Sequence, residues 1–539
     1  MRKLSGLRRR LSAISPIHDY PVGLIHPYWA RKPFNVVREI VRSLTEPGDA
    51  VADPFMGSGT TVFAALSLGR SVLASDINPL SAFLVEALLG LTSSRYDFKR
   101  EAHDFLEDVS AKTLGWFSVS DNEYMERERF KVAGDFRDGR FRLSRTELVT
   151  KEPNADRWRG RKVYRRGIRD LDYAVDKRFI RCPVDFDTLK LGRNPRIAIP
   201  EGARVSHYFT EANMASINVA LEIAGHTDVP RDVQRMRRLI LSSALPLLRL
   251  SDKKASSQWP YWRPKKSLTS RNPVMVLEDR VRCLSEAIDW LRENTPTVAV
   301  SSQYKTTYRT VPECFSVIRS WAIQNPAYGR HYSERFELVL TDPPYSDQIP
   351  YLEYSALWLS ILGLELQERA FEQEIVRTDS PERRHDTRDY INRLSNGLDV
   401  CCRLTKPGGH LVWFYQDTNL QHWKEIDSVT RRAGLRMLDV VPLPKQRRSM
   451  KTVTSPGRTL DGDLICIFKK DRSRTRSARK IGASEVMTQL EKSLYKLDRD
   501  ATFFDRYAVV IRECLVKGYL DGLAERYASI SDVLNEVTH

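Results

Sequence analysis

Cysteine is scarce in this 539-residue sequence, and its few copies follow no metal-binding pattern. The seven cysteines lie at positions 182, 283, 314, 401, 402, 466 and 514, and no two have the Cys-x-x-Cys spacing of a zinc ribbon. An odd number of cysteines without a disulfide framework indicates reduced thiols. We therefore expect a cytoplasmic protein that binds no metal.

Long apolar runs are also missing. No stretch approaches the roughly 20 residues that span a bilayer, and the basic residues 1–10 are not followed by the apolar region of a secretory signal. The sequence therefore predicts no membrane partner. Hydrophobic residues make up 41% and charged residues 29%, which is ordinary for a soluble protein of two or three domains.

Acidic residues are outnumbered by basic ones. Lys and Arg total 86 against 69 for Asp and Glu, a net charge of +17. Such an excess favours a polyanionic partner, although a merely basic soluble protein is the simpler alternative. Between positions 151 and 181, eleven basic residues accompany five acidic ones and interleaved aromatics. We expect this cluster and a later basic pair to contact the phosphates of such a partner. The candidate residues are Arg157, Arg159, Arg161, Lys162, Arg165, Arg166, Lys265 and Lys266.

Strand and helix signals alternate near the N-terminus. Strands are expected at 49–53 and 71–76 and helices at 58–68 and 79–89, a pattern that implies a parallel sheet. The alternation resumes near residue 298. Further elements are expected as a strand at 336–341, a helix at 387–404, a strand at 411–415, a helix at 423–433 and an antiparallel strand pair at 435–441 and 464–468.

The intervening part has a different character. Residues 96–200 are polar and Arg-rich, and we expect them to be irregular. Two helices are expected within 210–250 and another at 274–292, while residues 482–539 carry helical periodicity. The sequence therefore predicts a doubly wound α/β sheet with a large, partly helical insertion and a small C-terminal helical unit.

A glycine-rich turn follows the first strand and reads Asp53-Pro54-Phe55-Met56-Gly57-Ser58-Gly59-Thr60-Thr61. Glycines allow tight backbone geometry and close approach of a ligand. In doubly wound sheets, ligands bind outside the carboxyl ends of the strands. No Gly-Lys-Ser/Thr follows, which disfavours an ATP-binding loop. A turn that only packs strand against helix is the alternative.

Asp76 ends the second strand, where a carboxylate can accept the two hydroxyl hydrogens of a ribose. The same residue could instead cap the helix that starts at Asn78-Pro79. Both roles are compatible.

Asp342-Pro343-Pro344-Tyr345 follows the strand at 336–341. The amino group on a nucleobase is a poor nucleophile, because its lone pair is delocalised into the ring. A carboxylate and a backbone carbonyl can accept its hydrogens, and the two prolines stiffen the turn that aims the carbonyl. The tyrosine ring can stack on a base taken out of the duplex. An ordinary β-turn is the alternative.

These residues resemble the S-adenosylmethionine (SAM)-dependent DNA amino-methyltransferases, which modify adenine N6 or cytosine N4. The first motif of the family is similar to residues 53–61, and its Asp/Asn/Ser-Pro-Pro-Tyr/Phe motif is similar to residues 342–345. Residues 26–33 resemble the segment around the methionine end of SAM. Asp at the head of the catalytic motif favours adenine N6, whereas cytosine-N4 enzymes more often carry Ser. Cytosine C5 chemistry would need a Pro-Cys, which is absent from the sequence.

The resemblance implies a Rossmann-like class I methyltransferase sheet divided along the chain. Residues 1–95 would form the N-terminal part of the SAM-binding domain and 96–297 an inserted DNA-binding, target-recognition region. Residues 298–470 would form the catalytic part, and 471–539 a basic linker and C-terminal helical unit. The implied cofactor-binding residues are Tyr28, Trp29, Arg31, Lys32, Pro33, Asp53, Pro54, Phe55, Gly57, Ser58, Gly59, Thr60, Asp76 and Asn78, and the implied catalytic residues are Asp342, Pro343, Pro344 and Tyr345.

Three other functions remain open from the sequence. A cytosine-N4 DNA methyltransferase shares the same motifs. A tRNA guanine-N2 methyltransferase can carry Thr-Asp-Pro-Pro-Tyr, but usually has an N-terminal RNA-binding domain, and only about 20 residues precede the expected sheet here. A catalytically silent DNA-binding subunit is disfavoured by the intact Asp76, Asp342 and Tyr345. The expected partners are double-stranded DNA and, as an open possibility, other subunits of a restriction-modification or defence system.

Overall fold

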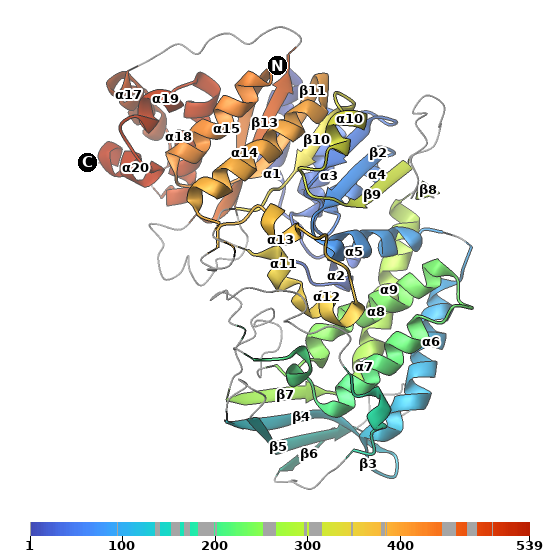
Figure 1. Cartoon of the computed structure of the whole chain (residues 1–539). Helices are drawn as coiled ribbons and strands as arrows, with labels where there is room; N and C mark the ends of the chain where they lie inside the picture. The colour runs from blue at the N-terminus through green and yellow to red at the C-terminus, as the bar shows by residue number, and fades with distance from the viewer. Residues whose placement is uncertain are drawn as a thin grey trace.

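The computed structural model describes most of the chain, and shows a central sheet between helices with a second sheet at some distance below it (Figure 1). The described residues are 2–93, 95–134, 141–151, 162–166, 173–181, 199, 202–251, 266–295, 299–300, 315–345, 349–378, 383, 385–444, 460–471, 482–498 and 500–538. Among the helices in these ranges, none is long and apolar enough to cross a membrane.

Eight strands form the central sheet, in the order β12-β13-β11-β10-β1-β2-β9-β8. All neighbours from β11 to β8 are parallel, and β13 and β12 complete one edge as the predicted antiparallel pair. This mixed α/β sheet is consistent with the expected Rossmann-like architecture. Its strands are β1 (Ala50–Asp53), β2 (Ser71–Asp76), β8 (Ala299–Val300), β9 (Phe315–Ser320), β10 (Phe336–Thr341), β11 (Thr405–Tyr415), β12 (Leu435–Pro444) and β13 (Gly462–Lys470).

Both faces of this sheet are covered and buried. Successive side chains of a strand point to opposite faces, so a strand can contribute to both hydrophobic clusters. On β10, Leu338 and Leu340 join the hydrophobic cluster on one face, and Val339 joins the cluster on the other. The helices that accompany the sheet are α1 (Arg2–Ala13), α2 (Pro21–Ile25), α3 (Phe34–Leu44), α4 (Thr60–Leu66), α5 (Pro79–Gly90), α10 (Ala327–His331), α11 (Tyr351–Tyr354), α12 (Ala356–Leu362), α13 (Ala370–Gln373), α14 (Thr387–Leu404) and α15 (Leu420–Arg432).

A second, antiparallel sheet lies between β2 and β8 in the sequence. Strand β4 pairs with β3, β5 and β7, and β5 pairs with β6. Long helices lie between this sheet and the central one (Figure 1). The elements of this region are α6 (Phe98–Thr113), β3 (Ser118–Ser120), β4 (Glu123–Gly134), β5 (Phe141–Lys151), β6 (Lys162–Arg166), α7 (Glu211–Ala224), α8 (Arg231–Leu248), β7 (Ser267–Arg271) and α9 (Pro273–Asn294).

The expectation that residues 96–200 are irregular is wrong for much of the described part. In α6, Phe98, Ala102, Phe105 and Val109 are buried at helical spacing among charged residues, so a narrow apolar stripe suffices to dock the helix. In the second sheet, charged side chains pair across strands. Arg145 of β5, for example, donates from Nε to Glu128 of β4 at 2.6 Å. Such cross-strand pairs stabilise strands whose composition alone is typical of a loop.

The last four helices pack beside the antiparallel edge of the central sheet (Figure 1). They are α17 (Ala483–Leu494), α18 (Phe503–Lys517), α19 (Leu520–Ala524) and α20 (Ile530–Thr538). The two ends of the chain meet at Asp439 of β12, which pairs with Arg8 of α1 at 3.1 Å and with Arg512 of α18 at 2.7 Å.

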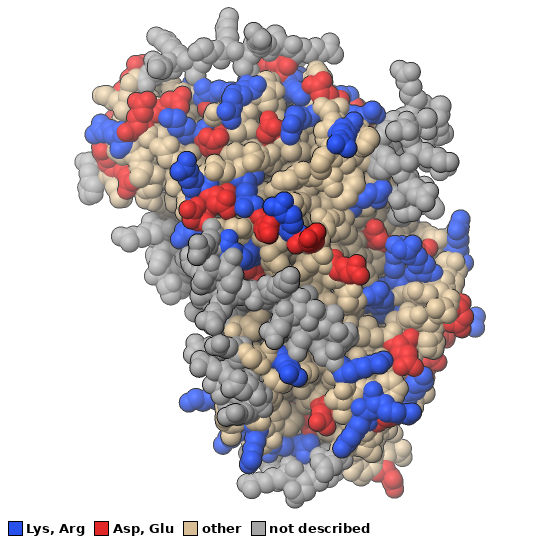
Figure 2. All heavy atoms as spheres, viewed as in Figure 1, with Lys and Arg blue, Asp and Glu red and all other residues tan. Residues whose placement is uncertain are grey.

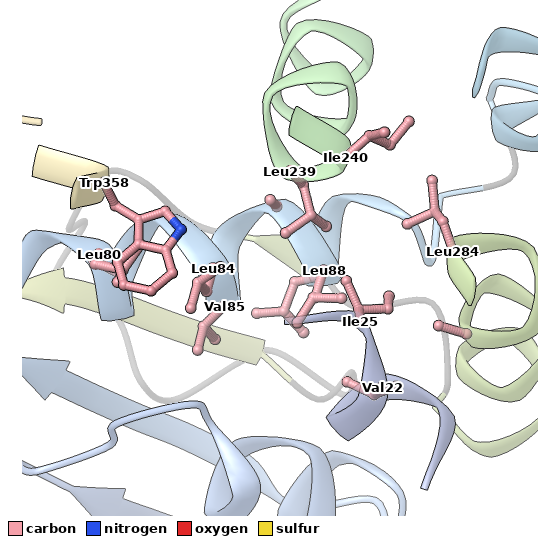
Figure 3. Packing of buried hydrophobic residues seen from close by; sticks show 14 of the residues in the cluster. Val22, Ile25, Leu80, Leu84, Val85, Leu88, Leu239, Ile240, Leu284 and Trp358 are labelled. Atoms are coloured by element: carbon pink, nitrogen blue, oxygen red, sulfur yellow. The ribbon is translucent and has the colours of Figure 1, made fainter. Parts of the chain in front are cut away.

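Trp358 of α12 connects the central sheet to the helices of the second region. Its buried ring lies near Leu80 and Leu84 of α5 (Figure 3). Its Nε1 donates to the carbonyl of Ser242 in α8 at 2.8 Å. Pro246 stands one helical turn later, and proline has no N–H with which to complete the helical hydrogen bond to that carbonyl. The indole therefore supplies the donor that α8 lacks.

Replacing this ring should destabilise the protein strongly. Trp358→Ala leaves a cavity between α5, α8 and α12, and we expect it to lower the free energy of unfolding by about 3–5 kcal/mol. Trp358→Phe retains most of the apolar volume but leaves the Ser242 carbonyl unpaired, so its loss should be smaller, about 1–3 kcal/mol. Urea denaturation checks both values. Equal stability of wild type and Trp358→Ala would contradict this packing.

Candidate functional site

The carboxyl ends of three neighbouring parallel strands, β10, β1 and β2, meet at one edge of the central sheet. A pocket opens there, and both sequence motifs contribute to its walls. The lining includes Tyr28, Trp29, Ala30, Arg31, Lys32, Asp53, Pro54, Phe55, Met56, Gly57, Ser58, Thr60, Asp76, Thr341, Asp342, Pro344, Tyr351, Gln373, Glu374 and Phe414. The structure thus brings together segments that are nearly 300 residues apart in the chain.

The glycine-rich turn owes its shape to two left-handed residues. Gly57 has φ 50° and Gly59 has φ 82°, a region that favours glycine. The ring of Tyr28 covers Gly57 so closely that a Cβ there would lie 3.1 Å from the Tyr28 Cε1. Gly59 caps α4, which therefore begins at Thr60 rather than at the predicted residue 58.

Asp76 accepts two backbone hydrogen bonds at the end of β2. Its Oδ2 accepts from the Gly57 N–H at 3.0 Å, and its Oδ1 accepts from the Asn78 N–H at 2.9 Å. Burial raises the pKa of this carboxyl to about 6, despite these bonds. The Asn78 side chain itself caps α5 and donates to the Ser355 hydroxyl at 2.7 Å, so it faces the protein interior.

Asp53 joins the two motifs directly. Its Oδ1 accepts from the Thr341 hydroxyl at 2.7 Å and from the Phe55 N–H at 3.1 Å. Thr341 immediately precedes Asp342, so the bond fixes the ends of β1 and β10 relative to each other. Burial raises the pKa of Asp53 to about 6.

Asp342 has a partner on each carboxylate oxygen. The Tyr345 hydroxyl donates to Oδ1 at 2.7 Å, and the Lys32 ammonium lies 2.9 Å from Oδ2. Burial raises the pKa of Asp342 to about 6, and the Lys32 charge acts in the opposite direction. The Tyr390 hydroxyl of α14 donates to the Pro344 carbonyl at 2.9 Å, and this bond anchors the turn to α14.

The upstream segment is tied to the glycine turn by Arg31. Its guanidinium donates to the Ser58 hydroxyl at 3.2 Å, to the His26 carbonyl at 2.8 Å and to the Gly23 carbonyl. The Tyr28 hydroxyl shares a 2.7 Å hydrogen bond with Ser81 of α5. Pro33 does not line the pocket but begins the turn into α3.

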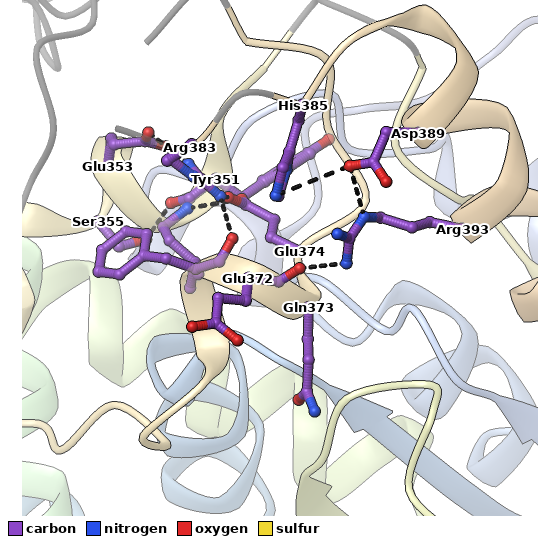
Figure 4. Close-up of polar contacts among 12 residues, drawn as sticks. Tyr351, Glu353, Ser355, Glu372, Gln373, Glu374, Arg383, His385, Asp389 and Arg393 are labelled. Atoms are coloured by element: carbon purple, nitrogen blue, oxygen red, sulfur yellow. Dashed lines mark hydrogen bonds and ion pairs between the residues drawn. The ribbon is translucent and has the colours of Figure 1, made fainter. Parts of the chain in front are cut away.

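Sequence reasoning missed one wall of the pocket. Glu374 lines it after α13 and accepts from the Leu352 N–H at 3.0 Å. Arg383 donates to both Glu374 and Glu353, as Figure 4 shows. Burial raises the pKa of Glu374, and the Arg383 charge opposes this. No motif surrounds these residues, and only Glu353 stands among apolar and aromatic neighbours in the sequence, which could have indicated a buried charge.

The comparison with known proteins agrees with this site. Residues 12–82 match the model of a DNA methylase family, N6_N4_Mtase. The Type II methyltransferase M.MjaII of Methanocaldococcus jannaschii is 28% identical over 134 residues, which are 24% of each chain. The Type II methyltransferase M1.MboII of Moraxella bovis is 45% identical over 47 residues, 9% of this chain and 18% of the relative. The Type II methyltransferase M.BglII of Bacillus subtilis is 40% identical over 60 residues, 11% and 16%.

Residues 12–82 are thus similar to a DNA methylase family, and parts of the chain are similar to Type II methyltransferases. The chain spans about a quarter or less of the length of these relatives. The family model covers Tyr28–Lys32, most of the glycine turn that lines the pocket, and Asp76, and these residues border one pocket with Asp342.

The DNA methylase family whose model matches residues 12–82 uses SAM as methyl donor, and the charges of the pocket suit this molecule. Four carboxylates line the pocket against two cationic side chains, Arg31 and Lys32. The four carboxylates are Asp53, Asp76, Asp342 and Glu374. This excess of negative charge fits the sulfonium cation and disfavours a phosphate-bearing cofactor.

The candidate DNA-binding residues of this chain are only partly described. Arg157, Arg159, Arg161 and Lys265 lie outside the described residues. Lys162, Arg165 and Arg166 lie on β6, and Lys266 is exposed immediately before β7, at the opposite edge of the second sheet. Lys and Arg side chains are spread over both the upper and the lower part of the face in Figure 2, interleaved with Asp and Glu. Contact with DNA stays a prediction. Within the described ranges, no three His, Cys, Asp or Glu side chains form a group suited to a metal ion.

Gly59 in the glycine-rich turn and Gly69 after α4 are a matched pair of glycines for mutation. A Cβ at Gly59 would lie 2.6 Å from the Val85 Cγ2, whereas at Gly69 the nearest atom is 3.9 Å away. Both glycines are left-handed, with φ of 82° and 75°. Gly69→Ala should therefore cost only backbone strain, about 1–3 kcal/mol. Gly59→Ala should cost roughly 1–3 kcal/mol more through overpacking, and should weaken SAM binding.

Thermal unfolding and calorimetric titration with SAM check this pair. If both variants lost equal stability, or if Gly59→Ala bound SAM normally, the turn would not be shaped by its contact with α5.

Proposed function

We propose that this protein transfers a methyl group from SAM to the exocyclic amine of a base flipped out of double-stranded DNA, with adenine N6 as the favoured target. The observation that carries the proposal is the shared pocket, in which Asp342 faces the same space as the glycine turn and Asp76. The relatives are named Type II methyltransferases, which supports a role in restriction-modification or another defence system in the cytoplasm.

Different residues of the pocket would bind the cofactor and activate the target amine. Asp76 lies where it can accept hydroxyl hydrogens of the ribose, and Tyr28 and the glycine turn form the neighbouring wall. SAM, when bound, supplies a methyl group whose bond to sulfur breaks with the electron pair remaining on sulfur. Asp342 and the carbonyl of Pro343 accept the two hydrogens of the amine and turn its lone pair toward that methyl. Asp342 can then accept the proton that the methylated nitrogen loses.

The tyrosines keep this acceptor in place. The Tyr345 hydroxyl orients Asp342, while its ring supplies an aromatic surface for the flipped base. The Tyr390 hydroxyl donates to the carbonyl of Pro344, and this hydrogen bond restrains the turn before any substrate binds. Such preorganisation supports an active enzyme rather than a silent DNA-binding subunit.

Mass spectrometry of nucleosides tests the proposal. DNA of diverse sequence incubated with the protein and SAM should yield N6-methyladenine. N4-methylcytosine would keep the reaction class but correct the base. Unmodified DNA together with N2-methylguanine in tRNA would overturn the proposal.

Removing the carboxylate should separate chemistry from cofactor binding. We expect Asp342→Ala to lower the methylation rate by at least about 100-fold, since the amine loses its main acceptor. SAM affinity should change little, because Lys32 keeps Asp463 as a partner. Asp342→Asn retains one acceptor oxygen and should keep more activity than Asp342→Ala. Parallel loss of SAM binding and methylation in both variants would indicate a structural role instead.

The affinity for SAM should depend on pH through Asp76. Its pKa of about 6 in the folded protein means that the ionised acceptor dominates only above that pH. Calorimetric titration should therefore show constant affinity at pH 7–8 and a fall of up to about tenfold per pH unit below 6. Asp76→Asn should bind weakly and lose this dependence. A wild-type affinity that is flat from pH 8 to 5 would contradict the assignment.

A further inference from the structure

Lys32 is shared between two carboxylates on different elements. Its ammonium lies 2.9 Å from Asp342 Oδ2 and 2.9 Å from Asp463 Oδ2. All three side chains are largely buried, with exposed fractions of 9% for Lys32, 22% for Asp342 and 12% for Asp463. Asp463 is the second residue of β13, in the antiparallel edge of the sheet, and belongs to none of the motifs.

The surroundings of Lys32 leave it little freedom. Its ammonium also lies 4.9 Å from the centre of the Tyr345 ring and 5.7 Å from that of Phe414. Two rings and two carboxylates thus surround one cation at the base of the catalytic turn. The burial of all three side chains distinguishes this charge network from a surface ion pair, which is exposed to water and contributes little.

We propose that Asp463 is a positioning residue of methyl transfer, which neutralises Lys32 so that the negative charge of Asp342 remains available to the target amine. The inference rests on the proposed function of Asp342. Lys32 in turn separates two buried carboxylates that would otherwise repel each other. The three residues act as one unit with a net charge of −1 beside the reacting nitrogen.

The charge balance explains why a third residue is needed. During transfer, positive charge moves from the sulfur to the amine nitrogen, beside Asp342. A Lys32 paired with Asp342 alone would cancel the carboxylate and oppose that charge. A carboxylate pair without Lys32 would hold a proton, because like charges in a buried site cannot both ionise easily. With both Asp463 and Lys32 present, the charge of Asp342 is not cancelled and the two carboxylates do not need to share a proton.

The effects of the two partners on Asp342 have opposite signs. The Lys32 charge lowers the pKa of Asp342, and the Asp463 charge raises it, in addition to the larger effect of burial. Other groups also face this site. Tyr345 lies on the same turn and Tyr351 on α11. Glu374 interacts electrostatically with Tyr351, and Asp53 accepts a hydrogen bond from Thr341, the residue before Asp342.

The pH dependence of single-turnover methylation, measured with SAM at saturation at every pH so that the effect of Asp76 on affinity is removed, tests the network. In the wild type, the rate should fall on the acid side as Asp342 takes up a proton. Asp463→Asn should shift this acid limb to lower pH and reduce the plateau rate by roughly tenfold or more. Lys32→Gln should shift the limb to higher pH. Lys32→Arg, which keeps the charge, should restore a limb close to that of the wild type.

Asp439→Asn is the matched control. Asp439 is also a largely buried aspartate between two cations, Arg8 and Arg512, but it lies away from the pocket lining. It should lower thermal stability without moving the acid limb. Circular dichroism and SAM titration of each variant show whether it is folded.

The outcomes separate the inference from the function on which it rests. Opposite shifts for Asp463→Asn and Lys32→Gln support the network. An unmoved limb in folded Asp463→Asn, or shifts in the same direction, would overturn it while methylation by the wild type stands. Absence of methylation by the wild type on every DNA would overturn the proposed function itself.

Discussion

The parallel pairing of β1 with β10 is the constraint on which the rest of the site depends. It places Asp53 beside Thr341, and the 2.7 Å hydrogen bond between them locks the two strand ends together. The glycine-rich turn leaves the sheet from one of these ends, and the turn that carries Asp342 and Tyr345 leaves it from the other. The second sheet and its helices lie between β1 and β10 in the sequence, yet the two strands are direct neighbours in the central sheet.

Aromatic side chains outside the pocket lining also contact the turn that carries Asp342 and Tyr345. The Tyr415 ring packs edge-on against Tyr345, with 5.7 Å between centroids, and its hydroxyl donates to Asp417 at 3.1 Å. Tyr507 of α18 donates to the Asp417 carbonyl at 2.9 Å. Helix α18 is thus connected to Tyr345 through Asp417 and Tyr415. Through Tyr390, α14 does the same for Pro344.

The sequence allowed prediction of those parts of the site that lie at strand ends. Asp53, Asp76 and Asp342 each follow an apolar strand, so their convergence at one sheet edge follows from parallel order alone. Asp463 and Glu374 could not be found in this way, because they reach the site through tertiary packing and carry no motif. The helix α6 and strands β4 and β5 were missed because cross-strand charge pairs and a narrow apolar stripe offset a composition typical of loops.

The central claim is that one pocket presents the methyl group of SAM to Asp342. A structure determined with SAM bound measures this most directly, through the distance from the methyl carbon to the Asp342 carboxylate. The account predicts the ribose at Asp76 and the methyl group directed toward Asp342, with room for one amine nitrogen between them. A ribose held by Asp342, or a methyl group directed away from it, would contradict the account.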